Sequence, residues 1–209
     1  MKHSCEVLEV ETPIEQSCPI CDEAGSLTMI AHTTEIAYFG EHTQVTLSCA
    51  ACGWKQSDLI PAEGGKPGAW SLPIKCEADL ATRVVRGSSC TVRIPELDLE
   101  VKPGTHSSGY VSNVEGVLER FQNIVEMVLR QLEGSAVDEI SQCVAMLAAL
   151  RGARSGIFDS ELTIELLDPR GHSQILHGDV VSRALSESEL DELAFGPDPS
   201  VFELDQGRN

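Results

Sequence analysis

The sequence predicts a mainly β protein with some α structure, in which a small four-cysteine zinc ribbon precedes a larger β-rich domain that contains a helical hairpin. Three observations support this prediction. Two C-x-x-C pairs lie near the N-terminus, short apolar stretches separated by turns follow them, and two adjoining segments with helical periodicity interrupt those stretches. With 209 residues, the chain is long enough for one large domain or for a small module beside a medium-sized one.

The predicted zinc ribbon depends on Cys18, Cys21, Cys49 and Cys52. In a C-x-x-C pair, one tight turn directs two sulfur atoms toward the same cation, and two such pairs supply the four thiolates of a tetrahedral Zn²⁺ site. Gly53 follows the last cysteine, at a position that often needs a left-handed backbone. Because four thiolates leave no open coordination position, we predict one structural zinc ion and no catalytic metal.

Other uses of these cysteines fit less well. A thioredoxin-like redox site needs a single C-x-x-C pair in a βαβ setting, and two disulfides are disfavoured in a cytosolic protein. His32 and His42 lie between the two pairs, and we expect them at solvent-facing loop or strand positions rather than as ligands. The remaining cysteines, which we expect to be buried small side chains or inert surface thiols, are Cys5, Cys76, Cys90 and Cys143.

The chain is acidic, with 15 Lys and Arg against 33 Asp and Glu and a formal net charge of −18. This charge argues against a protein whose main task is to bind nucleic acid or an anionic membrane, because both need clustered cations. The ribbon itself, from Cys18 to Trp54, contains no Lys or Arg. Because such a ribbon cannot hold phosphates, a protein is the better candidate for its partner. No secretion signal or membrane-spanning apolar segment is evident, so we expect a cytoplasmic protein.

The region after the ribbon contains short apolar stretches that are typical of strands. Three of them occupy residues 70–74, 82–85 and 91–94. A basic cluster there, on a solvated strand face or at a partner contact, consists of Arg83, Arg86 and Arg93. Farther along, the alternation at 162–166, the turn at 168–171 and the return at 173–176 predict a β-hairpin. One more short helix is expected to begin near Ser186.

Two adjoining segments show helical periodicity. Ser112 and Glu115 form a capping box, with Ser112 as the N-cap of the first helix. Gly134 separates it from a second helix that ends at Gly152, so an antiparallel helical hairpin is expected at about 112–152. The apolar stripe of the first helix consists of Val114, Val117, Leu118, Phe121, Ile124, Val125, Val128, Leu129 and Leu132. The stripe of the second consists of Val137, Ile140, Val144, Leu147, Ala148 and Leu150.

Several of these motifs together resemble the ZPR-type zinc-finger family. They are Cys18-x-x-Cys21, Cys49-x-x-Cys52-Gly53-Trp54, Arg93-Ile94-Pro95-Glu96-Leu97-Asp98-Leu99-Glu100, Val114-Glu115-Gly116 and Asp168-Pro169-Arg170-Gly171-His172-Ser173. Their order and spacing match from Cys18 to Ser173, which is most of the chain, and the block at 93–100 is far more specific than the ribbon alone. Eukaryotic members carry two such modules in tandem, whereas this chain carries one and resembles the archaeal form.

The resemblance implies a four-Cys zinc ribbon followed by a double-stranded β-helix (jelly-roll-like) domain with an inserted helical hairpin. The two segments with helical periodicity, framed by β segments, fit such an insertion. On this basis we expect four regions along the chain. They are an N-terminal extension at 1–17, the zinc ribbon at 18–56, a β-barrel domain at 57–196 and an acidic tail at 197–209.

The resemblance also implies a function, which is to bind a translation elongation factor 1-alpha type GTPase, either as a chaperone that assists its folding or by simple binding. We expect no enzymatic activity. Trp54 is then expected to anchor the client or, alternatively, to cover the zinc knuckle or the joint between ribbon and barrel. The remaining partner-binding candidates, which internal salt bridges and turn geometry would explain equally well, are Arg93, Glu96, Asp98 and Glu100.

Two other classes of protein stay open at this point. One is a zinc-ribbon protein associated with nucleic acid in transcription or translation, which the acidic ribbon opposes. The other is a jelly-roll metalloenzyme, which needs a cluster of His and carboxylate ligands inside the barrel. His172 and His177 lie five residues apart and would point to opposite faces of a continuous strand, so we predict no catalytic residue.

Overall fold

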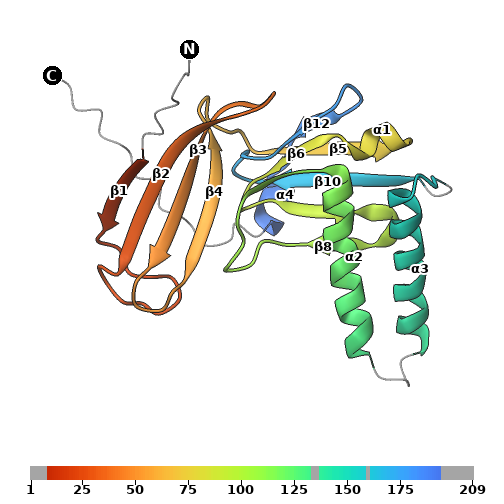
Figure 1. Cartoon of the computed structure of the whole chain (residues 1–209), viewed down its shortest axis with the longest axis horizontal. Coiled ribbons are helices and arrows are strands. Elements are labelled where there is room, and N and C mark those ends of the chain that lie inside the picture. Colours follow the sequence, from red (N-terminus) through yellow and green to blue (C-terminus); the bar gives the residue numbers. More distant parts are fainter. Residues whose placement is uncertain (1–8, 133–136, 159–160, 194–209) are drawn as a thin grey trace, which may run out of the picture.

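A computed structural model of the chain describes residues 9–132, 137–158 and 161–193 (Figure 1). Within these ranges, a four-stranded sheet from the first part of the chain lies beside a larger β-rich domain, from which two helices project. The protein is mainly β, as predicted, and the described ranges contain four α-helices, of which α1 was not predicted. None of these helices is long and apolar enough to span a lipid bilayer. The predicted tail at 197–209 lies outside the described residues.

The N-terminal unit is an antiparallel sheet with the strand order β1-β2-β3-β4. Its strands are β1 (Glu9–Ile14), β2 (Leu27–Ile36), β3 (Gly40–Cys49) and β4 (Lys55–Pro61). The buried cluster of this sheet is small and consists of Ile14, Cys18, Leu27, Leu47, Cys49 and Trp54. Because two of these six side chains are zinc-ligand candidates, the unit depends on its metal more than on a hydrophobic core.

The second unit contains two antiparallel sheets with the orders β12-β5-β10-β7-β8 and β11-β6-β9. The strands are β5 (Gly68–Ile74), β6 (Arg83–Arg86), β7 (Thr91–Ile94), β8 (Leu99–Val101), β9 (Tyr110–Asn113), β10 (Leu162–Asp168), β11 (Gln174–Leu176) and β12 (Val181–Ala184). The helices are α1 (Glu77–Leu80), α2 (Val114–Gln131), α3 (Val137–Arg154) and α4 (Glu187–Glu192), with a 3₁₀ turn at Pro95–Leu97. This is a jelly-roll domain with the α2–α3 hairpin inserted between β9 and β10, as expected from the resemblance.

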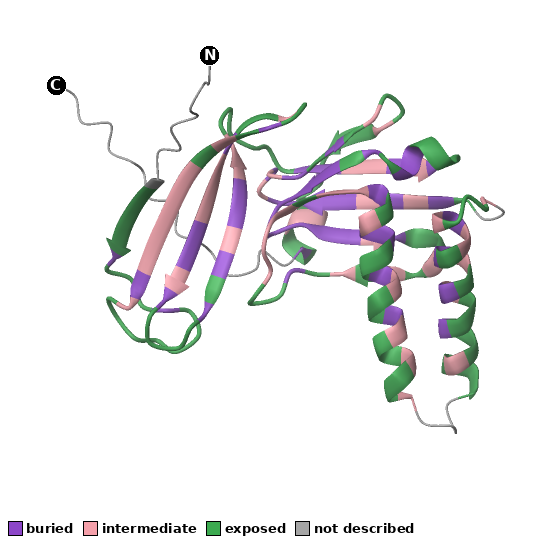
Figure 2. Cartoon of the chain, viewed as in Figure 1, coloured by how far each residue is buried: buried purple, intermediate pink, exposed green. Residues whose placement is uncertain are grey.

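One core joins the two sheets to the bases of the hairpin helices. Figure 2 shows buried residues on the strands and on the facing sides of α2 and α3 near the sheets. On β10 the predicted alternation is confirmed, because Leu162, Ile164 and Leu166 are all buried. The side chains of this core that are almost fully buried include Leu72, Ile74, Val84, Ile94, Leu118 and Leu150. The jelly roll therefore has a hydrophobic core of its own.

The predicted hairpin between 162–166 and 173–176 is wrong. β10 pairs with β5 and β7, whereas β11 pairs with β6 in the other sheet. The turn at Asp168–Gly171 carries the chain from one sheet to the next. A turn signal is local, while the partners of β10 lie about 70 to 100 residues earlier in the chain, so the sequence pattern did not distinguish a hairpin from a change of sheet.

Two details at the helix ends also differ from the prediction. The N-cap of α2 is Asn113, whose Oδ1 accepts a hydrogen bond from the amide of Gly116 (2.9 Å), and not Ser112. Ser112 instead lies within β9, paired with Val84. The second helix continues to Arg154, whose guanidinium forms an ion pair with Glu119 of α2 (3.2 Å).

The predicted inward stripes are correct near the sheets and wrong farther out. Ile124 and Val128 on α2, and Val137 and Val144 on α3, have exposed side chains. The hairpin extends beyond the sheets (Figure 1), so its outer turns have only the other helix to pack against. A wide apolar stripe then leaves its flanks in solvent. Outside the hairpin, the short helix expected near Ser186 is confirmed as α4, with Ser186 as its N-cap.

Candidate metal centre and domain joint

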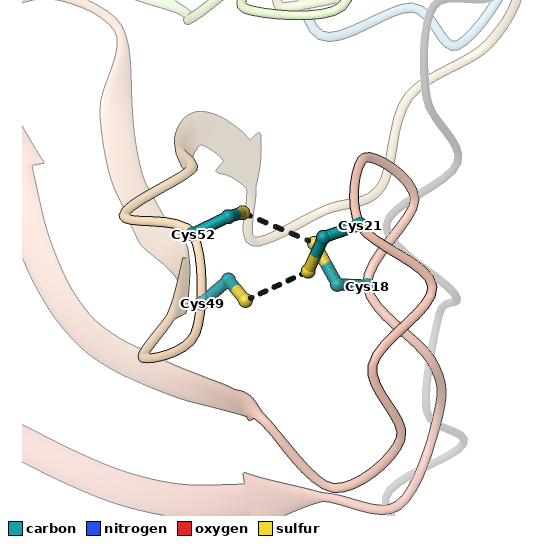
Figure 3. A group of neighbouring side chains, drawn as sticks. All are labelled: Cys18, Cys21, Cys49 and Cys52. Atoms are coloured by element: carbon teal, nitrogen blue, oxygen red, sulfur yellow. Dashed lines mark hydrogen bonds between the residues drawn. The ribbon is translucent and has the colours of Figure 1, made fainter.

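Two loops at the same end of the ribbon sheet bring the four predicted zinc ligands together. Cys18 and Cys21 lie in the loop between β1 and β2, while Cys49 ends β3 and Cys52 lies in the turn before β4. Figure 3 shows the four side chains pointing toward one another across the two loops. Their sulfur atoms all lie within 4.8 Å of one another.

The sulfur spacing fits a tetrahedral zinc ion. The distance between Sγ of Cys18 and Sγ of Cys52 is 3.8 Å, and that between Sγ of Cys21 and Sγ of Cys49 is 3.7 Å. A tetrahedron with Zn–S bonds of about 2.3 Å has edges of about 3.8 Å. The two measured distances therefore match the edges that zinc requires.

The two knuckles have the same backbone turn. The amide of Asp22 donates to the carbonyl of Cys18 (2.9 Å), and the amide of Gly53 donates to the carbonyl of Cys49 (3.0 Å). The residue after the second cysteine is left-handed in both knuckles, with φ of 58° at Asp22 and 74° at Gly53. The left-handed backbone predicted for Gly53 is therefore confirmed, and Asp belongs to the few other residue types that adopt it readily.

The acid–base properties of the thiols also favour a cation. A hydrogen bond with the Ser26 hydroxyl, 3.1 Å from Sγ, lowers the pKa of Cys49 to about 6. At Cys21 a backbone hydrogen bond near Glu23 acts in the lowering direction, but burial and the three neighbouring sulfur atoms raise the pKa to about 12. Four thiolates at this spacing repel one another, and a divalent cation removes that repulsion. The donor set thus fits one structural Zn²⁺ ion.

Histidine ligands take no part in this cluster. Within the described residues, the four cysteines are the one group of three or more His, Cys, Asp or Glu side chains close enough to share a metal. His172 contacts Asp58, and His177 lies 3.4 Å from Asp79, so the structure does not bring the two histidines together. The expectation that His42 faces solvent is wrong, since its side chain is buried and its Nδ1 lies 3.1 Å from the carbonyl oxygen of Gly40.

Trp54 lies beneath the second knuckle, at the joint between the ribbon and the jelly roll. Its side chain is 3% exposed and packs with the ribbon core. The indole N–H donates a hydrogen bond to the carbonyl of Thr105 (3.0 Å), in the loop between β8 and β9. Trp54 therefore covers the joint between ribbon and jelly roll, which is the alternative role expected for it.

The loop between β8 and β9 follows β4 closely and joins the two units. The amide of Gly109 donates to the carbonyl of Ser57 (2.8 Å), and Nε2 of Gln56 donates to the carbonyl of Ser107 (3.2 Å). The amide of Ser57 donates to the hydroxyl of Ser108 (3.2 Å). These contacts add the loop to the edge of the ribbon sheet.

A buried carboxylate on β4 forms the second link between the units. Asp58 is 3% exposed, and its oxygens accept hydrogen bonds from the amide (2.8 Å) and hydroxyl (2.8 Å) of Ser88 and from Nδ1 of His172 (3.0 Å). Burial acts to raise the pKa of Asp58, but the hydrogen bond and charge of His172, together with Ser88, lower it below its ordinary value. Asp58 is thus held as a carboxylate inside the joint.

The Asp168–Ser173 motif supports this link from the jelly roll. Asp168 is fully buried and accepts hydrogen bonds from the hydroxyls of Ser89 (2.6 Å) and Ser173 (2.6 Å). The hydroxyl of Ser173 accepts a further bond from the amide of Gly87 (2.9 Å). The motif therefore fixes the loop that carries His172 against the loop that carries Ser88.

The basic cluster expected on one face has three different positions. Arg86 is buried and donates to Ser107, Ser108 and the carbonyl of Cys90, so neither a solvated face nor a free partner contact describes it. Arg83 lies over the ring of Tyr38 in the ribbon, with its guanidinium carbon 5.6 Å from the ring centroid. Arg93 forms an ion pair with Glu100.

Sequence reasoning missed Asp58 and Arg86 as joint residues. Each is a single charged residue in a strand pattern, and such residues usually face solvent. No local signal separates them from solvated strand residues. One indirect sign was the alternative role expected for Trp54 at the joint between ribbon and barrel, because Asp58 follows Trp54 by only four residues.

The carboxylates of the 93–100 block are exposed, and most of them have internal partners. Glu96 accepts a hydrogen bond from the amide of Thr163 (3.0 Å), and Glu100 pairs with Arg93 and with Lys102 (3.1 Å). Asp98 has a left-handed backbone with φ of 51° after the 3₁₀ turn. The internal ion pairs and the turn geometry anticipated for this block are both present.

Fold and site together define a zinc-ribbon protein with a jelly-roll domain. Family models agree: the ZPR1 zinc-finger domain matches residues 9–67, and the ZPR1 jelly-roll domain matches residues 78–192. A ZPR1-like protein of Methanocaldococcus jannaschii is 37% identical over 86% of this chain and 88% of its own length. A ZPR1-like protein of Pyrococcus horikoshii is 34% identical over 86% of this chain and 80% of its own length.

Eukaryotic relatives are longer. The zinc finger chaperone zpr1 of Schizosaccharomyces pombe is 29% identical over 78% of this chain, which covers 34% of that protein. Zinc finger protein ZPR1 of Mus musculus is 29% identical over the same share, which covers 35% of its length. The chain belongs to the ZPR1 family, and it carries the zinc-finger and jelly-roll domains once.

Proposed function

We propose that this chain binds a GTPase of the translation elongation factor 1-alpha type and assists its folding, and that it does so by binding alone, without catalysis. The observation that most supports this proposal is the closed four-thiolate cluster, whose sulfur spacing fits zinc and leaves no coordination position for a substrate. The S. pombe relative is named a zinc finger chaperone, which agrees with such a role. The proposal retains the cytoplasmic location expected from the sequence.

We further propose that both units form the surface that contacts the client, and the buried joint between them supports this. Asp58 and Trp54 fix the ribbon to the jelly roll through buried hydrogen bonds. A client can therefore meet both units in one preformed arrangement, which reduces the entropy lost on binding. In this view Trp54 acts by shaping the surface from beneath, and not by touching the client.

The exposed candidates for client contact lie on the knuckles and in the 93–100 block. Ile20, at the first knuckle, has an apolar side chain that is 44% exposed. Glu96 and Glu100 have internal partners, whereas the carboxylate of Asp98 has none among the described residues. We therefore propose Ile20 and Asp98 as the first residues to test.

Calorimetry with the purified elongation factor from the same organism tests the proposal. The factor is titrated in its GDP, GTP and nucleotide-free states, and after partial unfolding. Binding in at least one state is expected, and Ile20→Ser or Asp98→Asn should weaken it by about tenfold. The matched controls are Val181→Ser and Asp179→Asn, at exposed positions outside the proposed surface, which should leave the affinity unchanged. Absence of heat in every state would refute the proposal.

A nucleic-acid role has less support. The segment from Cys18 to Trp54 contains no Lys or Arg, and a phosphate backbone is bound mainly through such residues.

A further inference from the structure

A groove of about 470 Å³ lies on the jelly roll, between α2 and the chain segment that leaves β8, and none of the four cysteines lines it. Its floor is apolar and is formed from the sheet by Val92 and Val101 and from α2 by Val117 and Phe121. Ile124 lies at its edge with a side chain that is 36% exposed. Large apolar side chains of a ligand would find a matching surface here.

The rim of this groove is positively charged. Arg86, Lys102 and Arg120 line it, and its lining contains no Asp or Glu. This is unusual in a chain with 33 acidic and 15 basic residues. Of the three cations, Arg86 is buried and Lys102 pairs with Glu100 just outside the groove (3.1 Å). The rim therefore offers a local attraction for negative charge, mainly at Arg120, on a chain whose net charge is −18.

Arg120 is the cation best placed to act on a ligand. Its guanidinium carbon lies 4.1 Å from the centroid of the Tyr110 ring, so stacking holds the side chain in place. Within the described part of the chain, Arg120 forms no ion pair. Arg86 instead donates hydrogen bonds to Ser107, Ser108 and Cys90. The Arg120 guanidinium keeps its donors available for a carboxylate.

We propose that this groove binds a short linear segment of a partner protein that combines a carboxylate with large apolar side chains. The apolar side chains lie on the floor between β8 and α2, and the carboxylate accepts hydrogen bonds from Arg120 at the rim. A nucleic acid fits less well, because the apolar floor offers nothing to a phosphate backbone and the rim has few cations.

This inference goes beyond the proposed function, since it assigns a second surface and the chemistry of the segment that occupies it. The two can also fail separately. Binding of peptides to the groove is measured without the elongation factor, and binding of the elongation factor is measured without peptides.

Fluorescence anisotropy of labelled peptides tests the proposal on the zinc-loaded full chain. Four peptides of equal length are compared: acidic with Leu and Phe, basic with Leu and Phe, acidic without apolar residues, and apolar without charge. A labelled single-stranded RNA is the fifth probe. The acidic peptide with Leu and Phe should bind most tightly, and added salt should weaken its binding, because part of the attraction is between charges.

Variants within one helix locate the site. Arg120→Glu and Ile124→Ser should each weaken binding of the acidic, apolar peptide by about tenfold or more. The matched controls on the same helix are Arg130→Glu and Val128→Ser, which lie outside the groove lining and should bind as the wild type does. All four positions are exposed, and circular dichroism checks that each variant is folded.

Several results would overturn the proposal. They are equal binding of all four peptides, preference for the basic peptide, an unchanged affinity of Arg120→Glu, or an equal loss in the Arg130→Glu control. RNA binding that exceeds peptide binding and disappears in Arg120→Glu would identify the groove as a nucleic-acid site instead.

Discussion

Nδ1 of His172, on the jelly roll, lies 3.0 Å from Oδ2 of Asp58, on the last strand of the zinc ribbon, inside the joint between the two units. Because a carboxylate can only accept hydrogen bonds, Nδ1 of His172 carries the proton. Ser88 donates two further bonds to the same carboxylate. This buried acceptor connects three segments that are far apart in the sequence, so its removal should loosen the joint.

Replacing Asp58 with Asn should lower the free energy of unfolding at neutral pH by about 2 kcal/mol or more. The reason is that an amide NH₂ group replaces one buried oxygen and meets the donors of Ser88 and His172. The measurement is chemical denaturation of the zinc-loaded protein. Asp98→Asn, the same change at an exposed position, is the control and should be nearly neutral. An equal effect of the two substitutions would show that Asp58 does not stabilise the joint.

The contribution of Asp58 should also depend on pH in one direction. Its pKa in the folded protein lies below the ordinary value of 3.8. The stability it adds is therefore complete above that ordinary value and is lost as the pH falls through the folded pKa. The difference in unfolding free energy between the wild type and Asp58→Asn should shrink over that range, and zinc release affects both proteins alike. A difference that grows in acid would contradict this assignment.

Removal of zinc should unfold the ribbon and spare the jelly roll. The ribbon has a small core, two members of which are the ligands Cys18 and Cys49, whereas the jelly roll has a large core of its own. After chelation, hydrogen exchange should therefore rise in β2, β3 and β4 and remain slow in β10 and the base of α2. Loss of protection throughout the chain would show that the two units fold as one.

Trp54→Ala should lower the free energy of unfolding by about 3 to 5 kcal/mol, because it removes a large buried side chain at the joint. Trp54→Phe keeps much of the packing but loses the hydrogen bond to Thr105. That loss should lower the free energy of unfolding by about 1 kcal/mol, in addition to the effect of the smaller ring. Denaturation measures both, alongside calorimetry with the client. A stable Trp54→Ala variant that fails to bind would instead make Trp54 a client anchor.

Gly171→Ala should destabilise the jelly roll by about 2 kcal/mol or more, because its φ is 72° and an added Cβ would lie 2.2 Å from the carbonyl oxygen of Lys66. The control is Gly156→Ala, where φ is 78° but nothing lies within 4 Å. That variant should lose only about 1 kcal/mol, the intrinsic cost of a left-handed alanine. Thermal denaturation compares the two, and equal losses would rule out the close approach at Gly171.

Local chemistry explains which parts of the fold could be predicted. The spacing of Cys18, Cys21, Cys49 and Cys52 determines a metal site almost by itself, since each knuckle is built from consecutive residues. The helical hairpin could be predicted as well, because helical periodicity and the break near Gly134 are features of the local sequence. The jelly-roll arrangement came from the family resemblance, and not from the strand pattern.

Long-range pairing explains what could not be predicted. The predicted β10–β11 hairpin is wrong because the partners of β10 are β5 and β7. Arg86 was expected on a solvated strand face or at a partner contact, and Asp58 had no predicted role, although both side chains are buried. A charged residue in a strand reveals its partner only after the sheets are assembled, and here the partners lie in the other unit or in a distant loop.

The most direct test of the central claim is to measure binding of the elongation factor by calorimetry with the zinc-loaded chain, with the zinc-free chain and after zinc is restored. If zinc acts by shaping the ribbon for its client, the loaded chain binds, chelation weakens binding at least about tenfold, and added zinc restores it. Zinc analysis of the same samples should give one ion per chain. Equal binding by the zinc-loaded and zinc-free chains, or binding by neither, would contradict the account.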